Sequence, residues 1–241
     1  MKLGLIGGTG ALDVFEVHEE RALDTAFGEP SAAVTRVTLG DNEAWFLARH
    51  GRPHRIPPHR INYRANIDGF KQLGVEGIVA INAVGGLDPA LPPGTLVIPD
   101  QLIDYTWNRI HSFSDDSDSP LLHVEFARPF DGRLRQGLLS AADAAGIGVI
   151  DSGCVAVTQG PRLETAAEVR RLQRDGCSVV GMTSMPEAAL AREAGLDYAS
   201  LCVVANPAAG LEDEPISIDA IERVLAGAME NVVRLLASLA P

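Results

Sequence analysis

Short runs of β-branched and other apolar residues alternate along this chain with longer segments of helical periodicity. The runs predicted as strands are Leu3–Ile6, Val34–Leu39, Ala44–Ala48, Gly77–Ile81, Thr95–Pro99, Val155–Thr158, Ser178–Met182 and Ala199–Val204. The segments predicted as helices are Asn62–Leu73, Gly132–Ala145, Glu164–Arg174, Pro186–Ala194 and Ala220–Leu239. Strands that are separated by helices of this length usually pair in parallel. The alternation therefore predicts an α/β fold with a largely parallel sheet.

The C-terminal segment has the most regular helical pattern. Its apolar residues recur every three or four positions: Ile221, Val224, Leu225, Ala228, Val232, Leu235, Leu236 and Leu239. Asp219 followed by Glu222 resembles a capping box and predicts where this helix begins. No internal repeat or linker divides the chain, so we expect residues 1–241 to form a single domain.

Composition and charge exclude several classes of protein. The 241 residues are 46% hydrophobic and carry a formal net charge of −12, whereas nucleic acids and anionic membranes attract positive charge. No run approaches the roughly 18 apolar residues that span a bilayer, and the glycine-rich N-terminus does not resemble a signal peptide. Three cysteines without disulfide or zinc-ligand spacing suit a reducing compartment. We expect a cytoplasmic protein with no nucleic-acid or membrane partner.

One segment of this acidic chain is strongly basic. Residues 44–67 contain no Asp or Glu but include Arg49, His50, Arg52, His54, Arg55, His59, Arg60 and Arg64. Arginine offers forked donors that suit phosphate oxygens, so the segment indicates an anion site; a solvated basic face or ion pairs with a neighbouring subunit would fit it equally well. The histidines lack the spacing and the companion ligands of a metal site, so no metal is expected.

A glycine-rich turn, Gly7-Gly8-Thr9-Gly10, follows the first predicted strand. Such turns present backbone N–H groups to phosphate. An NAD(P) oxidoreductase is disfavoured, because Asp13 occupies the place of the third glycine of the dinucleotide motif. The only lysines, Lys2 and Lys71, also cannot form the Tyr-x-x-x-Lys pair of short-chain dehydrogenases. The turn is therefore expected to bind a simple anion.

Six segments, in order, resemble the purine nucleoside phosphorylase and methylthioadenosine phosphorylase family. They are GGTG (7–10), RHGRPHRIPPHRINYRANI (49–67), NAVGGL (82–87), TQGPRLETAAE (158–168), GMTSMPEAALAREAG (181–195) and VVANPAAG (203–210). The resemblance implies an α/β fold of the purine nucleoside phosphorylase type, with a central mixed sheet partly closed into a barrel and flanked by helices. It further implies a homotrimer, no metal or organic cofactor, and phosphorolysis of an N-glycosidic bond.

The resemblance also implies where phosphate and sugar bind. The phosphate-binding residues would be Thr9, Arg49, His50, Asn82, the backbone of Ala83, and Thr183. Asn82 stands where the methylthioadenosine enzymes carry threonine. Met182 would pack against the ribose and bind its hydroxyls through its backbone. These residue types suit a reaction that holds an anionic nucleophile below a sugar of oxocarbenium character.

Two positions predict which purine is bound. The methylthioadenosine enzymes carry aspartates where this chain has Asn206 and Ala208, on either side of Pro207. An asparagine amide can donate to a 6-keto oxygen and accept from a protonated N7. Glu164 matches the 6-oxopurine enzymes and would accept from the N1–H of hypoxanthine. On their own, Glu164 is equally well explained as a helix N-terminal carboxylate and Asn206 as a turn residue.

The group on the 5′ carbon is predicted from the beginning of the last helix. Enzymes for ordinary nucleosides carry a histidine there, whereas this chain aligns Ile218 and Ile221 with the apolar pocket of the methylthioadenosine enzymes. Burial of a methylthio group in such a pocket is favourable by about 1–3 kcal/mol. From periodicity alone, these isoleucines would equally well begin the core-facing stripe of the helix. His123 matches a residue that reaches the pocket from the neighbouring subunit.

Together these positions predict phosphorolysis of 5′-methylthioinosine to hypoxanthine and 5-methylthioribose 1-phosphate, a purine salvage step. Catalysis would depend on Asn206, Glu164 and His50. The alternatives within the family are cleavage of methylthioadenosine, or of inosine and guanosine. The alternatives outside it are the NAD(P) oxidoreductase and a non-catalytic nucleoside-binding protein.

Overall fold

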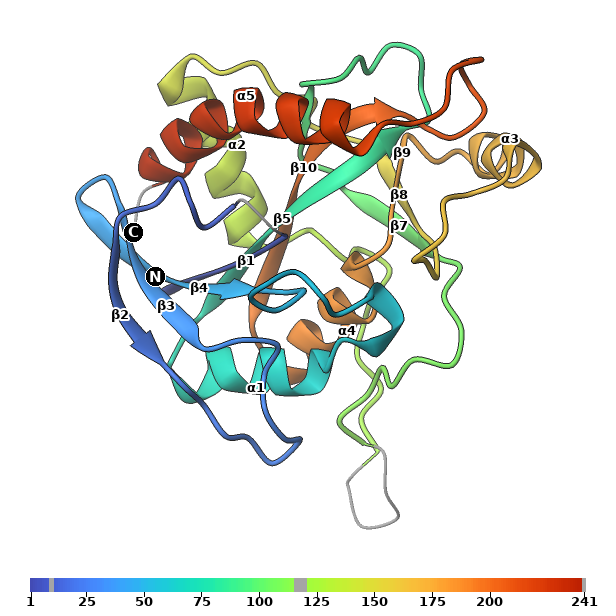
Figure 1. Ribbon diagram of the computed structural model, residues 1–241. Helices are drawn as coiled ribbons and strands as arrows, with labels where there is room; N and C mark the ends of the chain where they lie inside the picture. Colours follow the sequence, from blue (N-terminus) through green and yellow to red (C-terminus); the bar gives the residue numbers. More distant parts are fainter. Residues whose placement is uncertain (9–10, 115–120, 240–241) are drawn as a thin grey trace.

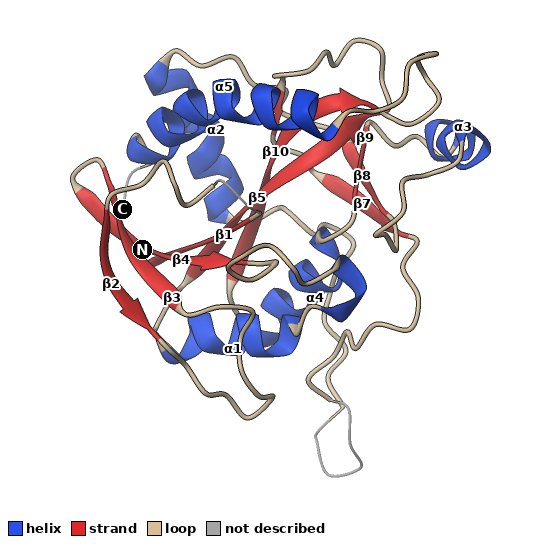
Figure 2. Ribbon diagram, in the orientation of Figure 1, coloured by secondary structure: helices blue, strands red, loops and turns tan. Residues whose placement is uncertain are grey.

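The computed structural model describes residues 1–8, 11–114 and 121–239, and in these ranges it shows one sheet with helices on both faces (Figure 1, Figure 2). The strands are β1 (Leu3–Gly7), β2 (Val17–Arg21), β3 (Val34–Leu39), β4 (Asn42–Ala48), β5 (Gly77–Gly86), β6 (Leu96–Val97), β7 (Gln101–Asp104), β8 (Cys154–Val157), β9 (Val179–Gly181) and β10 (Asp197–Pro207). The helices are α1 (Tyr63–Gln72), α2 (Arg133–Ala145), α3 (Ala166–Arg174), α4 (Ser184–Ala194) and α5 (Ile218–Ala237), with a short 3-10 helix at Pro58–Arg60.

The long strand β5 connects the two halves of the sheet. β10 runs parallel to it along one edge, from Gly77 to Gly86. On the other edge, β1 pairs in parallel with residues 77–81 and β9 pairs antiparallel with Gly85 and Gly86. The strand order is β2-β3-β4-β1-β5-β9-β8-β7, and β6 pairs with β10.

The sheet is mixed, as the family resemblance implies: among the described residues five strand pairings are parallel, including the long pairing of β5 with β10, and four are antiparallel. β3 lies antiparallel to β2 and β4, and β6 lies antiparallel to β10. Within the described ranges the strand path ends at β2 and at β7, with no pairing between these two strands. The expected partial barrel is therefore an open, branched sheet whose hydrogen bonds do not close.

Alternate residues of the central strand face opposite layers of the fold. Val79 and Ile81 pack with residues of α2 and α5, whereas Ile78 and Ala80 pack with residues of α1 and α4. Figure 2 shows these two helix pairs on opposite faces of the sheet. Burial on both faces explains why this strand is a continuous apolar run in the sequence.

Every predicted strand and helix is present, with ends displaced by a few residues. The sequence patterns miss β2, whose residues are polar and largely exposed, and β7, a four-residue strand at the end of the sheet. The last helix begins at Ile218, and its N-cap is Ser217, whose Oγ accepts from the Ala220 N–H at 3.4 Å. The predicted cap at Asp219 is therefore wrong.

No helix in the described ranges has the length and apolar character needed to cross a membrane.

A carboxylate at the start of β10 holds the start of α2. Asp197 Oδ2 accepts a hydrogen bond from the Leu134 N–H at 2.9 Å, and so satisfies one of the free amides of this helix end. The N-cap residue, Gly132, has no side chain to do this, and a Cβ there would collide with the Asp197 carboxylate.

We expect Asp197→Ala to lower the free energy of unfolding by about 1 kcal/mol, because the amide loses its acceptor. Asp197→Asn keeps an acceptor oxygen and should retain most of this stability. Urea unfolding of the wild type and both variants gives the comparison. Equal losses for alanine and asparagine would show that the hydrogen bond is not what stabilises the helix.

Candidate active site

Two of the predicted phosphate-binding residues, Asn82 and Ala83, lie at a gap in strand pairing on one edge of β5. β1 pairs with this edge as far as Ile81, and β9 pairs with it only at Gly85 and Gly86. Residues 82–84 therefore have no strand partner here, and Ala83 is exposed although its two neighbours are buried. Since β1 is parallel and β9 antiparallel to β5, the ends of β1 and β9 approach this gap from opposite directions. The gap leaves backbone groups available at the place where the phosphate site is predicted.

Arg49 comes directly after β4, and one edge of its guanidinium forms an ion pair with a buried carboxylate. Its Nε and Nη2 donate to the two oxygens of Glu187 at 2.7 and 2.8 Å, and Nη2 also donates to the Ile6 carbonyl at 3.3 Å. The side chains of Arg49 and Glu187 are 2% and 0% exposed. Tyr198 Oη donates to Glu187 at 2.9 Å. Nη1 of Arg49 takes no partner in the described part of the chain and is the donor left for an anion.

Burial alone would lower the pKa of Arg49, but the adjacent Glu187 carboxylate outweighs it and raises that pKa above its usual range. The guanidinium therefore stays charged. A bidentate pair of this kind also fixes its orientation. Burial raises the pKa of the Tyr198 phenol well above its ordinary value, so this phenol stays protonated and remains a donor.

Thr183 and Asn82 lie together at the gap. Thr183 Oγ1 donates to Asn82 Oδ1 at 3.3 Å, and Asn82 Nδ2 donates to Ser200 Oγ at 2.8 Å. The amide of Asn82 is thus directed into the protein, where it positions Thr183. Thr183 is the N-cap residue of α4 but makes no side-chain cap bond, which leaves its oxygen available to a ligand. The predicted phosphate contact Thr9 lies outside the described residues.

His50 is held as one defined tautomer. Its Nδ1 lies 2.8 Å from the Ile56 carbonyl oxygen, which can only accept, so Nδ1 carries the proton and donates. Its ring stacks on His54 with centroids 4.4 Å apart. Burial lowers the pKa of His50 to about 4; the Ile56 carbonyl opposes the shift, whereas Arg49 and His54 add to it. His50 is therefore neutral at pH 7 and presents an Nε2 lone pair.

Glu164 lies just before α3 and is not part of its cap. The N-cap is Thr165, which exchanges hydrogen bonds with Glu168 in a capping box. Glu164 Oε1 instead accepts from Thr158 Oγ1, at the end of β8, at 2.6 Å. Its second oxygen has no partner among the described residues. Glu164 therefore makes no cap hydrogen bond to α3, and its carboxylate is held by Thr158 instead.

Asn206 and Ala208 lie where β10 ends beside β5. Asn206 pairs in register with Gly85, and its Nδ2 donates to the Pro207 carbonyl at 2.6 Å. The Asn206 side-chain oxygen has no partner in the described ranges. Ala208 is buried in a small apolar cluster with Val180 and Leu87, so its position has no room for solvent around a charge.

Met182 is held through its backbone by a residue that the sequence reasoning missed. The Met182 carbonyl accepts from Arg109 Nη1 at 2.8 Å, and the Met182 side chain lies against Gly160, where a Cβ would approach its sulfur at 2.5 Å. Arg109 is buried, as is the equally unforeseen Glu187. The only signal for Glu187 is an isolated charge within the apolar segment MPEAAL, and the signal for Arg109 is weaker still.

The residues predicted to bind the 5′ group are not brought into the core of this chain. Ile218 is 65% exposed, Ile221 is half-buried, and His123 is exposed on the segment between β7 and α2. Neither isoleucine belongs to an apolar cluster of the described residues. The alternative that they begin the core stripe of α5 is therefore wrong for Ile218, because the buried stripe begins at Ala228.

The rest of the basic segment is mostly peripheral. Arg52 pairs with Glu20 at the surface, Arg64 lies over the Phe27 ring, and Arg55 is exposed. In the described part of the chain, no group of three or more His, Cys, Asp or Glu side chains is arranged to hold a metal ion.

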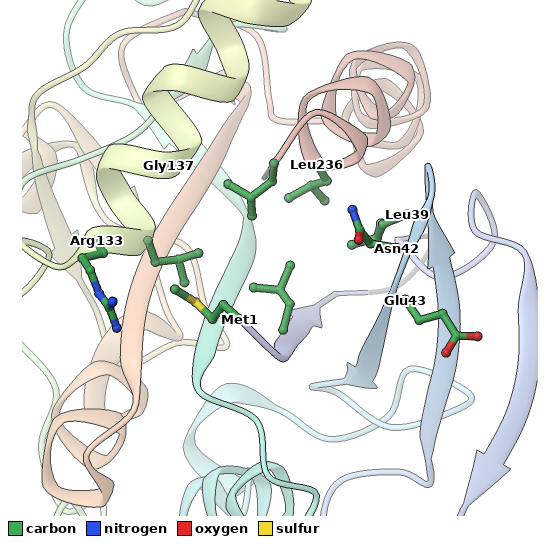
Figure 3. Close-up of a pocket in the computed structure, with 10 residues that line it drawn as sticks. Met1, Leu39, Asn42, Glu43, Arg133, Gly137 and Leu236 are labelled. Carbon is green, nitrogen blue, oxygen red and sulfur yellow. The ribbon is translucent and has the colours of Figure 1, made fainter. Parts of the chain in front are cut away.

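A separate cavity of about 140 Å³ lies at the other end of β1, away from these residues. It is lined by Met1, Leu3, Leu39, Asn42, Glu43, Arg133, Leu134, Gly137, Leu236 and Leu239 (Figure 3). None of the predicted site residues that the structure describes contributes to it.

The tautomer and burial of His50 predict a pH dependence of stability. The pKa of about 4 in the folded chain lies below the ordinary value of 6.5, so the unfolded state binds more protons between these values. The free energy of unfolding should therefore fall as pH falls through this window, and His50→Gln should make that decrease shallower. Urea unfolding of the wild type and of His50→Gln, from about pH 7 down to about pH 4, measures this change in the free energy of unfolding. Parallel pH profiles for the two proteins would contradict the assignment.

Comparisons with known proteins identify the family of the chain. The model of the phosphorylase superfamily matches residues 2–241. A protein of Xylella fastidiosa named "Probable S-methyl-5'-thioinosine phosphorylase" is 51% identical over 88% of this chain and 90% of its own length. A Pseudomonas syringae protein of the same name is 47% identical over 97% and 96%.

A crystal structure of a variant of adenosine/methylthioadenosine phosphorylase from Schistosoma mansoni, in complex with methylthioadenosine, superimposes with a TM-score of 0.93. It is 33% identical, and the match covers 99% of this chain and 90% of that one. Sequence and fold thus agree over nearly the full length, and the chain belongs to the phosphorylase superfamily.

Proposed function

We propose that this protein cleaves 5′-methylthioinosine with phosphate, releasing hypoxanthine and 5-methylthioribose 1-phosphate. The observation that carries the proposal is Glu164: Thr158 fixes one of its oxygens, and the other is left for a ligand. This enzyme would be a pentosyltransferase of the purine nucleoside phosphorylase type. The names of the Xylella and Pseudomonas relatives support the same substrate.

The base preference follows from hydrogen-bond polarity. An ionised Glu164 accepts from the N1–H of hypoxanthine, whereas adenine presents a lone pair at N1 and would leave the carboxylate unpaired. Such a mismatch costs about 1–3 kcal/mol, and more for a charge. Asn206 adds an amide N–H for the 6-keto oxygen and a carbonyl for a protonated N7 of the leaving base. Ala208 cannot supply the second aspartate of the adenine-cleaving enzymes.

The preference for a methylthio group rests on the beginning of α5. Ile218 is exposed in the single chain, although exposure of a large aliphatic side chain is unfavourable. A substrate tail enclosed by Ile218, Ile221 and His123 from a neighbouring subunit would cover it.

A homotrimer would supply that neighbour. Its support is apolar exposure on the segment that carries His123: Trp107 is 66% and Leu121 is 77% exposed, and Ile110 and Leu122 are exposed as well. Several large apolar side chains exposed on one segment favour an interaction surface there.

Phosphate would be the nucleophile, without a metal or organic cofactor. The groups proposed to bind it are Arg49 Nη1, Thr183 Oγ1, His50 Nε2 and the backbone at Ala83, beside the gap in the pairing of β5. Because His50 is neutral, its Nε2 would accept a hydrogen bond from a phosphate hydroxyl, while Arg49 carries the compensating charge.

The substrate assignment is tested by supplying phosphate with methylthioinosine, methylthioadenosine or inosine and following the free base. Methylthioinosine should be cleaved fastest. Fastest cleavage of methylthioadenosine would contradict the base assignment, and fastest cleavage of inosine would contradict the pocket assignment. In the variant Glu164→Ser/Asn206→Asp the ratio of 6-amino to 6-oxo activity should rise, and an unchanged ratio would place the base preference elsewhere.

To test the role of Arg49, a variant is needed that does not leave the buried Glu187 carboxylate without a partner. Loss of Arg49 alone leaves a buried charge and should cost about 3–5 kcal/mol of stability. Arg49→Met/Glu187→Gln removes both charges and keeps an acceptor for Tyr198, so it should be more stable than Arg49→Met. In this variant the KM for phosphate should rise by about 10- to 100-fold, the range of a charge-assisted hydrogen bond. An unaltered phosphate KM would remove Arg49 from the site.

A further inference from the structure

Arg109 makes more hydrogen bonds than its place in a loop would suggest. It lies in the segment between β7 and α2 and is 6% exposed. Its acceptors are the Met182, Met185, Thr158 and Gln159 carbonyls at 2.8, 2.6, 3.2 and 2.7 Å, the Gln159 side chain at 3.2 Å and Tyr63 Oη at 3.2 Å. Every nitrogen of the guanidinium is used.

These acceptors belong to separate elements that meet at the proposed nucleoside site. Thr158 and Gln159 follow β8 and lead to Glu164, while Met182 and Met185 follow β9. No β-ladder joins these segments beyond the pairing of Val157 with Gly181 and the Thr158 N–H bond to the Gly181 carbonyl. Past that point Arg109 holds them together.

The connection extends to the basic segment. Tyr63 Oη accepts from Arg109 and donates to the Pro58 carbonyl at 3.0 Å, and Arg109 also lies over the Tyr63 ring with its Cζ 5.7 Å from the centroid. Pro58 in turn lies next to Gly160, whose Cβ position is 3.3 Å from the proline Cγ. One guanidinium therefore ties three site-forming segments together.

The exposure of side chains around Arg109 is the reverse of what their polarity favours. Trp107 and Ile110 are exposed, whereas the charged residue between them is turned inward. Burial of a charge is costly unless hydrogen bonds compensate it, and a methionine of similar length would fill the same space without that cost. The presence of an arginine at this buried position is therefore explained by its hydrogen-bond donors and not by packing.

We propose that Arg109 is a positioning residue that fixes Met182 and the Thr158–Glu164 segment relative to each other, and so sets the affinity for the nucleoside without touching it. The inference deepens the proposed function and rests on it for its catalytic consequence. Its structural consequence, the order of these two segments, is independent of any substrate.

The test compares Arg109→Met with Arg135→Met. Arg135 is also buried and also donates to backbone carbonyls, those of Pro99 at 2.9 Å, Ile98 at 3.1 Å and Asp151, but these lie away from the site segments. Hydrogen–deuterium exchange should rise in residues 158–164 and 182–185 for Arg109→Met and should not rise there for Arg135→Met. This difference is one that general destabilisation would not produce.

In Arg109→Met the kcat/KM for the nucleoside should fall by about 10²-fold, as expected for misplaced contacts, while the KM for phosphate stays within about twofold.

Arg109→Lys can reach only part of the acceptors and should recover part of the loss. If Arg109→Met does not fold, the lysine variant is used for the test, with smaller changes of the same kind. Unchanged exchange in the two segments would overturn the proposal, as would equal losses for nucleoside and phosphate. A wild type that cleaves no purine nucleoside would overturn the proposed function instead, and the exchange data would still decide the role of Arg109.

Discussion

The buried pair of Arg49 and Glu187 is the interaction on which the arrangement of the site depends. Neither charge would be stable alone at this depth, so each requires the other, and Tyr198 satisfies the carboxylate further. The pair joins the end of β4 to the first turn of α4. It thereby fixes a positive charge whose Nη1 has no partner among the described residues.

The topology explains why the proposed phosphate site lies beside β5. A sheet in which β1 and β9 approach one edge of β5 from opposite directions leaves a short stretch of that edge unpaired. Asn82 lies in this stretch and accepts a hydrogen bond from Thr183, which follows β9. Arg109 and Tyr63 join the half of the sheet that contains β8 and β9 to the basic segment, so the residues proposed to bind phosphate and nucleoside are held in one frame.

The regular part of this structure can be predicted from the sequence, because strands buried on both faces and amphipathic helices have distinct periods. Polar edge strands such as β2 cannot be predicted in this way, because Val17–Arg21 has no alternation of apolar and polar residues. The motifs identify Arg49, Thr183, Glu164 and Asn206, but periodicity and motif together miss Glu187 and Arg109. These two residues act through partners far away in the chain, and only the folded chain shows that Glu187 meets Arg49 and that Arg109 meets Met182. The direction of the Asn82 amide, into the protein and toward Ser200, is likewise set by a neighbouring strand.

The most direct measurement of the central claim is a crystal structure of the protein with hypoxanthine and phosphate bound. Glu164 should lie within hydrogen-bonding distance of the base N1, Asn206 should contact the 6-keto oxygen and N7, and phosphate should lie against Arg49 beside Ala83. A base held elsewhere, or one that leaves Glu164 and Asn206 turned away from its ring, would contradict the claim.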